Sequence, residues 1–489
     1  MSTLADRLRG IVSGAVPRVA PDGRGAEEDA AAPIATYRGL DAASLARAAA
    51  VLGGSVSTLP NGATIVVDRF YEAGSQYGRV TIGDIADVLL DGEEALALLT
   101  SAWPASAPAR DSFSTGASAR QARSAMLELT RLDGREAAAA PPDSRQAQPL
   151  WFLDLETTGL AGGAGTQAFL VGCACLDRDG FSVRQFLLPG YEHERALLAE
   201  MSAWAAERGA IVTFNGRSFD VPLIETRYLF HRQPFPLEGR PHVDMLHPAR
   251  RLWRARGEWE GASEASCSLG TLEKLIAGVH RVGDVPGFEI PSRYFRFVRD
   301  GDARPLEAVL EHNRLDLVSL ALVMARALTL VERGPSAALS PYECLGLARI
   351  YDRAGRRDEA EASYLQSIDR LGRVGRDPET LADALRRLAY CRRRGGRWRD
   401  AADAWQRLAD LPRCPAAIRH EAREALAIYH EHRARDLNTA HAHARQLFSN
   451  PVSGRQRDAA EHRLRRLERK LARKTMSSSL FLEPIDDQA

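Results

Sequence analysis

The chain contains almost no lysine and little cysteine for its 489 residues. Lysine occurs only at positions 274, 470 and 474, so arginine supplies nearly all of the positive charge. Lysine and arginine together number 65 against 64 acidic residues, and the resulting net charge of +1 excludes a generally basic nucleic-acid-binding chain. Arginine suits phosphate recognition, but a preference spread over the whole chain marks no site.

The six cysteines lie too far apart, or in too apolar a setting, to indicate a disulfide framework or a zinc site. No apolar run reaches the roughly 18–20 residues that a membrane helix needs. No apolar segment of the secretory type follows Met1. We therefore expect a cytoplasmic protein that has no membrane partner.

Composition divides the chain into several parts. Residues 1–35 are rich in Ala, Gly, Asp and Arg and are expected to form a disordered tail. Residues 36–102 are expected to form a small N-terminal module of unknown role, with a hairpin over 55–68 around Pro-Asn-Gly. Residues 103–149, rich in Ala, Ser and Pro, are expected to be a linker, and 476–489 a flexible tail.

The pattern of apolar and polar residues changes at Leu150. Three apolar or alternating segments separated by turns predict three adjacent strands. After them, helical periodicity alternates with a short apolar run that predicts a buried strand. The first expected strand begins at Trp151, and the others cover 168–176, 181–188 and 210–214. The expected helices cover 194–207, 221–231, 246–253, 269–277 and 306–332. This order predicts an α/β domain over 150–333, with a mixed central sheet and flanking helices.

The remainder of the chain shows a repeating helical pattern. An alanine followed four positions later by an aromatic residue occurs as Ala360 with Tyr364 and again as Ala401 with Trp405. The repeat length of about 40 exceeds the 34 residues of a simple tetratricopeptide array, which a loop insertion explains. We expect an all-α, tetratricopeptide-like region over 338–475, which offers a surface to a protein partner.

Four acidic residues are candidates for chemistry. Asp154 and Glu156 end the first predicted strand of the α/β domain, and residues two apart in a strand project from the same face. Adjacent carboxylates repel one another unless a cation lies between them, and hard divalent cations take oxygen ligands of this kind. The following Thr157-Thr158-Gly159-Leu160 allows a tight turn where backbone can approach a phosphate.

Two further motifs contain acidic residues. Asn215-Gly216 ends a short strand and Asp220 begins the next helix, where an N-cap role is the simpler alternative. His312 and Asp316 lie one helical turn apart and can place a base beside a metal ligand. For that pair alone, an ordinary surface pair is the simpler alternative.

In sequence order the motifs are D-x-E-T-T-G-L, N-G-x-x-F-D and H-N-x-x-D. This order resembles the DEDD exonuclease superfamily of ribonuclease H-like proteins. More narrowly it resembles the YprB-type family, in which the first motif also continues into a Gly-rich stretch and then Phe-Leu-Val-Gly, here Phe169 to Gly172. The resemblance covers about 150–333, and a carboxy-terminal tetratricopeptide-like region also occurs in this family.

The resemblance implies a metal-dependent 3′–5′ exonuclease acting on DNA or RNA 3′ ends. Asp154, Glu156, Asp220 and Asp316 would hold two Mg²⁺ or Mn²⁺ ions. His312 would orient or deprotonate the attacking water. Thr157, Thr158, Gly159, Leu160 and Asn215 would contact the terminal nucleotide.

One departure from the superfamily pattern concerns the third motif. DEDD enzymes usually carry Tyr-x3-Asp or His-x4-Asp there, whereas this chain has a histidine at the tyrosine spacing, with Glu311 and Asn313 beside it. Two alternatives therefore stay open: a catalytically weak nucleic-acid-binding scaffold that recruits partners through its helical repeats, and an endonuclease using the same metals. A metal cluster of His242, Asp244 and His247 is less favoured, because Asp244 is expected to support the active-site helix.

Overall fold

The computed structural model describes residues 40–100, 150–159, 165–253, 267–449 and 453–480. The predicted tail 1–35 and linker 103–149 therefore lie outside the described residues, as do Leu160 and most of the predicted tail 476–489. No helix among the described residues is long and apolar enough to cross a membrane.

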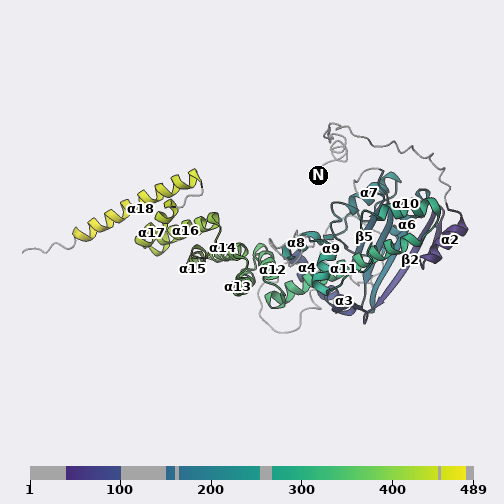
Figure 1. Cartoon of the computed structure of the whole chain (residues 1–489), viewed down its shortest axis with the longest axis horizontal. Coiled ribbons are helices and arrows are strands. Elements are labelled where there is room, and N and C mark those ends of the chain that lie inside the picture. The colour runs from purple at the N-terminus through teal and green to yellow at the C-terminus, as the bar shows by residue number, and fades with distance from the viewer. Residues whose placement is uncertain (1–39, 101–149, 160–164, 254–266, 450–452, 481–489) are drawn as a thin grey trace, which may run out of the picture. The chain divides into compact units, whose positions relative to one another are not determined.

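Seven strands form one mixed sheet in the order β1-β2-β7-β6-β5-β8-β9 (Figure 1). The strands are β1 (Ser55–Leu59), β2 (Gly62–Glu72), β5 (Trp151–Thr157), β6 (Ala168–Leu176), β7 (Gly180–Leu187), β8 (Ile211–Thr213) and β9 (His242–Asp244). β5, β6 and β7 are antiparallel neighbours, whereas β8 and β9 continue the sheet in parallel with β5. The three successive strands predicted from residue 150 onward are thus confirmed. β9 was not predicted, because its single apolar residue, Val243, stands between His242 and Asp244 and no apolar run marks the strand.

The segment expected to be a separate module over 36–102 is instead part of this sheet. β2 pairs with β7 along eight residues, from Ile65 opposite Leu187 to Glu72 opposite Gly180. The predicted hairpin is present as β1 and β2. The other elements of this segment are α2 (Ala42–Val51), α3 (Ile82–Asp91), α4 (Glu93–Leu99) and a small hairpin of β3 (Gln76–Tyr77) and β4 (Val80–Thr81). The sequence hides this arrangement because the β2–β7 pairing joins segments more than a hundred residues apart.

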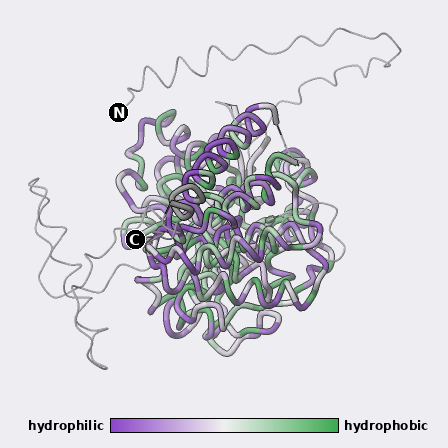
Figure 2. The backbone as a smooth tube through the Cα atoms, turned by 90° about the vertical axis from the view of Figure 1, so that its left-hand side faces the viewer, coloured by the Kyte–Doolittle hydropathy of each residue, from purple (hydrophilic) through white to green (hydrophobic). Residues whose placement is uncertain are grey.

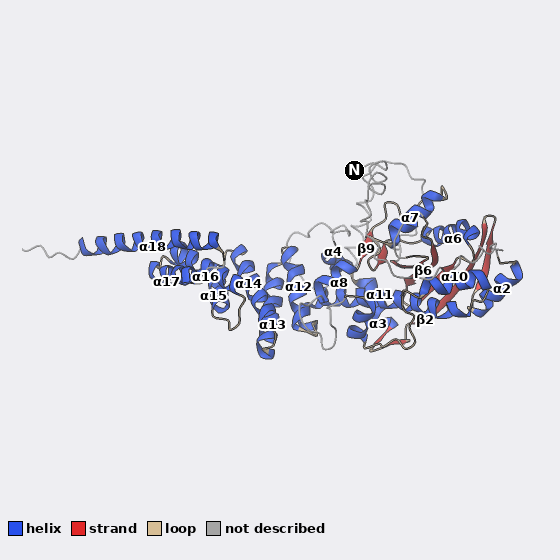
Figure 3. Cartoon of the chain, turned by 45° about the horizontal axis from the view of Figure 1, so that its top comes forward, coloured by secondary structure: helices blue, strands red, loops and turns tan. Residues whose placement is uncertain are grey.

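Helices cover both faces of the sheet (Figure 3). They are α6 (Glu194–Ala206), α7 (Asp220–Phe230), α8 (Leu246–Trp253), α9 (Leu269–Ala277), α10 (Ile290–Asp300) and α11 (Glu307–Arg333), with short 3₁₀ turns η2 (Tyr191–His193), η3 (Arg304–Leu306) and η4 (Gly334–Ala337). All were predicted to within one or two residues except α10 and the short turns. Alternation along β5 separates the two cores: Phe152 packs in one, and Trp151 and Leu153 pack in the other.

The long helix α11 is the element that brings site residues to the sheet. It packs against β5, β6 and β7 and also against α3, α4 and α9. Its second half is apolar on nearly every side, from Leu317 to Val331, which explains why it is buried among so many neighbours. The polar residues His312, Asn313 and Asp316 precede this stretch and lie beside the end of β5.

The region after residue 333 is helix-rich, with described helices that contact one another in chain order. They are α12 (Pro341–Arg353), α13 (Arg357–Val374), α14 (Pro378–Arg394), α15 (Trp398–Ala409), α16 (Ala416–Tyr429), the π-helical turn η5 (His430–Ala434), α17 (Leu437–Ser449) and α18 (Gly454–Leu480). Ala360 and Ala401 are buried at the helix contacts. Hydrophilic residues prevail along α18 (Figure 2). Tetratricopeptide likeness stays a prediction.

The first helix of this region shares a core with the α/β domain. Gly346 of α12 lies against the backbone of Arg251 and Leu252 in α8, where a β-carbon would clash. The buried Glu343 accepts a hydrogen bond from Trp253 at 2.9 Å and pairs with Arg326 at 2.8 Å. A cut at the predicted boundary near Gly334 would therefore expose apolar surface of α8.

Candidate active site

Strand β5 presents two carboxylates on one face of the sheet. Asp154 and Glu156 project to the same side, while Leu155 between them is buried among residues of the opposite face. The regular pairing of β5 with β6 shifts between Glu156 and Thr157, directly after the second carboxylate. The regular β-pairing of the strand therefore ends directly after the two acidic residues.

Asp220 reaches the same place from the first turn of α7. The preceding loop is held by Asp244, whose side chain accepts hydrogen bonds from the backbone N–H groups of Asn215 at 2.8 Å and Arg217 at 3.1 Å. Asn215 has a φ of 68°, a left-handed conformation that asparagine tolerates better than most residues. The N-cap position belongs to Phe219, and no side chain caps this helix, so the N-cap alternative for Asp220 does not apply.

α11 supplies the third group of residues through a buried amide. Asn313 donates from Nδ2 to Asp154 Oδ2 at 2.8 Å and to the Asp154 carbonyl at 3.2 Å. Gln185 of β7 in turn donates to Asn313 Oδ1 at 2.8 Å. A β-carbon at position 172 would overlap the Asn313 side chain, so only glycine fits there. Asn313 thus fixes Asp154 relative to the helix that carries Asp316.

The loop between α9 and α10 contributes two charged residues. Asp284 forms a hydrogen bond with His312 Nδ1 at 2.6 Å, which leaves His312 Nε2 facing Asp316 Oδ2 at 3.7 Å. Arg281 forms an ion pair with the other oxygen of Asp316, at 2.7 Å. His312 is therefore oriented by one carboxylate and directed toward another.

Asp154, Glu156, Asp220 and Asp316, hereafter the acidic cluster, influence one another electrostatically. Burial, and then the charges of Asp316, Glu156 and Asp220, raise the pKa of Asp154 well above its usual range. Burial, followed by Asp316 and Asp220, raises the pKa of Glu156 to about 8. Burial and Asp244 raise the pKa of Asp220 to about 7. Burial also raises the pKa of Asp316, although Arg281 and His312 oppose the rise. Such a cluster favours an added cation over four free charges.

The donor set of the acidic cluster fits Mg²⁺ or Mn²⁺ in chemical kind. It consists of carboxylate oxygens only, the ligands that these hard cations prefer. Within the described residues, no three His, Cys, Asp or Glu side chains converge as a ready metal-binding group. Arg281 engages Asp316 Oδ1, which leaves Oδ2 as the oxygen that this residue would offer to a cation.

The residues expected to touch substrate border the cluster. Thr157 Oγ1 donates to the Gly159 carbonyl at 2.9 Å. Thr158 Oγ1 accepts from the Gln167 N–H at 3.0 Å. The two hydroxyls thus shape the turn after β5, and Gly159 lies in it. Leu160 falls outside the described residues.

Several residues at the site were not predicted. Arg281 and Asp284 stand in a loop without periodicity, so no pattern in the sequence pointed to them. The disfavoured cluster of His242, Asp244 and His247 is no metal site: His242 bonds Thr213 Oγ1 at 2.8 Å, and Asp244 holds backbone N–H groups.

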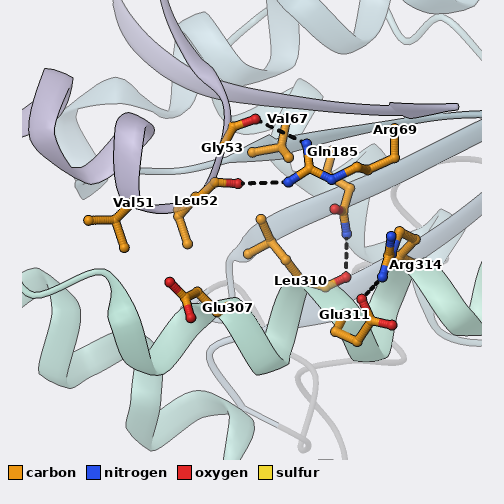
Figure 4. A pocket seen from close by; sticks show the side chains of 10 residues that line it. All are labelled: Val51, Leu52, Gly53, Val67, Arg69, Gln185, Glu307, Leu310, Glu311 and Arg314. Carbon is orange, nitrogen blue, oxygen red and sulfur yellow. Dashed lines mark hydrogen bonds and ion pairs between the residues drawn. The ribbon is translucent and has the colours of Figure 1, made fainter.

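A cavity of about 240 Å³ lies next to the residues that support Asp154 (Figure 4). Gln185 lines it and donates to the Leu310 carbonyl at 2.8 Å, while Arg314 at its edge pairs with Glu311. A second cavity of about 490 Å³ lies between helix ends of the helix-rich region, next to Arg356 and Arg397. No residue of the acidic cluster lines either cavity. The cluster lies where β5, an interior strand of the sheet, ends.

Comparisons with known proteins show the family of the chain. A family model described as the RNase_H superfamily matches residues 151–328. Over 327 residues, the chain is 31% identical to the uncharacterized protein YprB of Bacillus subtilis (strain 168), covering 66% of this chain and 75% of that protein. The chain belongs to the YprB family. A solved family B DNA polymerase from the hyperthermophilic archaeon Pyrobaculum calidifontis matches with a TM-score of 0.28 at 15% identity, over 45% of this chain and 30% of that one.

Membership of the YprB family confirms the resemblance seen in the motifs. The RNase H-like domain indicates a nuclease, and a nuclease implies binding of nucleic acid. Nucleases of this superfamily typically use divalent metals. The helix-rich region lies beyond the residues matched by the superfamily model.

Proposed function

We propose that this YprB-family chain is a metal-dependent 3′–5′ exonuclease that hydrolyses phosphodiester bonds of DNA or RNA. The observation that carries the proposal is the meeting of four acidic side chains from β5, α7 and α11. Burial raises the pKa of all four, and the charges of other cluster members add to the rise at Asp154 and Glu156. A cluster of desolvated acids in which Arg281 compensates only Asp316 is costly to the fold, and a functional site explains the cost.

Asp154, Glu156, Asp220 and Asp316 would hold two Mg²⁺ or Mn²⁺ ions, which would supply an activated water and charge stabilisation of the departing 3′ oxygen. His312 is the base in this proposal. Its Nδ1 is bonded to Asp284, so Nε2 is the nitrogen that can take the proton of the attacking water. Asp284 is a positioning residue that fixes this orientation.

The turn of Thr157, Thr158, Gly159 and Leu160, together with Asn215, would contact the terminal nucleotide. Asp244 preorganises this contact, because it bonds the Asn215 and Arg217 backbone N–H groups. The helix-rich region would recruit a protein partner, since consecutive helices leave extended surfaces beside one another.

One observation favours the alternative of a catalytically weak nucleic-acid-binding scaffold. Arg281 already neutralises Asp316, and the described acidic residues form no ready metal group. In that case nucleic acid would bind without being cut. The presence of all four acids, with a histidine held in place by Asp284, supports the enzyme instead.

The test uses the full chain with end-labelled single- and double-stranded DNA and RNA, in Mg²⁺, in Mn²⁺ or in EDTA. We expect mononucleotides released from free 3′ ends, loss of activity in EDTA, and protection by a blocked 3′ end. Cleavage of the blocked substrates would replace the exonuclease proposal with an endonuclease. Binding without cleavage in either metal would favour the scaffold.

A further inference from the structure

Arg281 is held at the acidic cluster by contacts on every side of its guanidinium. Its Nη2 lies 2.7 Å from Asp316 Oδ1, and its Nε donates to Glu273 Oε2 at 2.8 Å. Weaker contacts reach Asp284 at 3.5 Å and the Ser319 hydroxyl at 3.2 Å. The Arg281 side chain is only 9% exposed. This is therefore a built position rather than a surface ion pair.

The far side of the guanidinium is anchored in the core. Glu273 on α9 is buried and accepts a hydrogen bond from Tyr77 at 2.6 Å. The Tyr77 hydroxyl also bonds Ser319 at 2.9 Å. A chain of buried groups thus runs from the β3–β4 hairpin through Glu273 to Arg281 and ends on Asp316. Because its Glu273 anchor is rigid, Arg281 presents a fixed positive charge to the cluster.

We propose that Arg281 is an internal counter-cation that competes with the divalent metal for Asp316. Arg281 neutralises Asp316, and a bound metal would compete with it for this carboxylate. The charge of Arg281 thereby weakens metal affinity, and its anchoring by Glu273 limits how far it does so. This inference rests on the proposed metal-dependent function and adds a residue that sets the metal requirement.

If Arg281 merely stabilised the fold, its loss would change metal affinity in the opposite direction. Loss of a structural arginine loosens the site, so metal affinity and melting temperature fall together. Loss of a competing cation removes repulsion from the metal and frees an oxygen ligand, so affinity rises while the metal-free chain becomes less stable. The sign of the change in metal affinity therefore separates the two roles.

The experiment measures Mn²⁺ binding to the full chain by isothermal titration calorimetry, without nucleic acid, alongside metal-free melting temperatures. We expect Arg281→Gln to bind Mn²⁺ about tenfold more tightly or better, the order that a nearby unit charge produces. Glu273→Gln keeps an acceptor for Tyr77 but leaves Arg281 less neutralised, so it should bind Mn²⁺ more weakly. Asp154→Asn is the control that removes a proposed ligand and should abolish binding.

The double variant Glu273→Gln with Arg281→Gln replaces the buried ion pair by a neutral pair. It should therefore fold even if Arg281→Gln alone leaves Glu273 unpaired and fails to fold. It too should bind Mn²⁺ more tightly than wild type. Equal or weaker binding by the folded arginine variants, with normal Asp154-dependent binding by wild type, overturns the role of Arg281 and leaves the nuclease proposal standing. Absence of Mn²⁺ binding in wild type and all variants overturns both.

Discussion

Buried carboxylates in the two halves of this chain behave in opposite ways. In the helix-rich region, Glu431 has a fully buried side chain, with Arg466 at 2.5 Å and Lys470 at 2.7 Å. Burial alone would raise its pKa, but these cations lower the pKa overall. In the α/β domain, burial and neighbouring acids raise the pKa of Glu156 to about 8, and no cation opposes this rise.

The difference separates structural from functional use of buried charge. An acid with a full set of cationic partners is neutralised within the chain and has no need of a ligand. Glu194 is a second example in the α/β domain itself, held by Arg227 at 2.5 Å and His231 at 2.7 Å. The acidic cluster breaks this pattern, and Arg281 compensates only one of its members. The remaining charge is the physical reason to expect a cation there.

The largest effect is expected for Asp154→Asn and Glu156→Gln. Each should lower nuclease turnover by more than about 10³-fold, because loss of a metal ligand removes several kcal/mol of transition-state stabilisation. Without metal, each variant should melt slightly above wild type, since repulsion is relieved. Turnover and melting temperature are measured on one preparation, with Asp68→Asn, an exposed partner of Arg184, as the control. Unchanged turnover in either variant would remove the β5 pair from the site.

A somewhat smaller loss is expected for His312→Ala. Turnover should fall roughly 10²–10⁴-fold, the range for loss of an acid–base group, while Mn²⁺ affinity changes much less because the carboxylates remain. His312→Tyr restores the commoner residue at this spacing and should keep partial activity. Asp284→Asn should cost about 10–100-fold, as for other residues that orient a catalytic side chain. A variant that melts early but turns over normally per folded molecule would make His312 a packing residue.

The parts of the site that depend on local spacing in the sequence were predictable, and those that depend on contacts between distant segments were not. The alternation of β5 was enough to place Asp154 and Glu156 on one face, and helical spacing placed His312 one turn before Asp316. Arg281 and Asp284 come from an irregular loop, so only the fold shows that they meet α11. The pairing of β2 with β7 was missed for a similar reason. The sequence shows the β1–β2 hairpin through its turn, but it does not show which distant strand pairs with the other side of β2.

In the helix-rich region, Glu431→Gln should act on stability alone. Removing the carboxylate leaves Arg466 and Lys470 without their common partner. Because these cations are 35% and 43% exposed, the cost should be about 1–2 kcal/mol, below that of a fully buried pair. Glu461→Gln is the matched control, because Glu461 pairs with Arg465 at the surface, where such pairs contribute roughly 0–1 kcal/mol. Circular dichroism in urea measures the loss for both. A fall in nuclease turnover per folded molecule would show that this region reaches the active site.

The effect most specific to the comparison is the pH dependence of stability without metal. In the unfolded chain, carboxyl pKa values lie near 4. In the folded chain, Glu156 titrates at about 8 and Asp220 at about 7. Between these values the folded state binds more protons than the unfolded state, so the free energy of unfolding falls as pH rises.

In EDTA, the melting temperature should therefore be roughly 10 °C lower at pH 8 than at pH 5.5, since the two groups together are worth about 5 kcal/mol over this interval and each kcal/mol about 2–4 °C in a domain of this size. Glu156→Gln should flatten the slope, and saturating Mn²⁺ should remove it, because the cation then compensates the ionised cluster. Glu431→Gln should keep the wild-type slope: the pKa of Glu431 is lowered, so its contribution is lost only as pH falls below about 4. A melting temperature that rises from pH 5.5 to pH 8 in EDTA would mean that the acidic cluster is already compensated without metal, as Glu431 is.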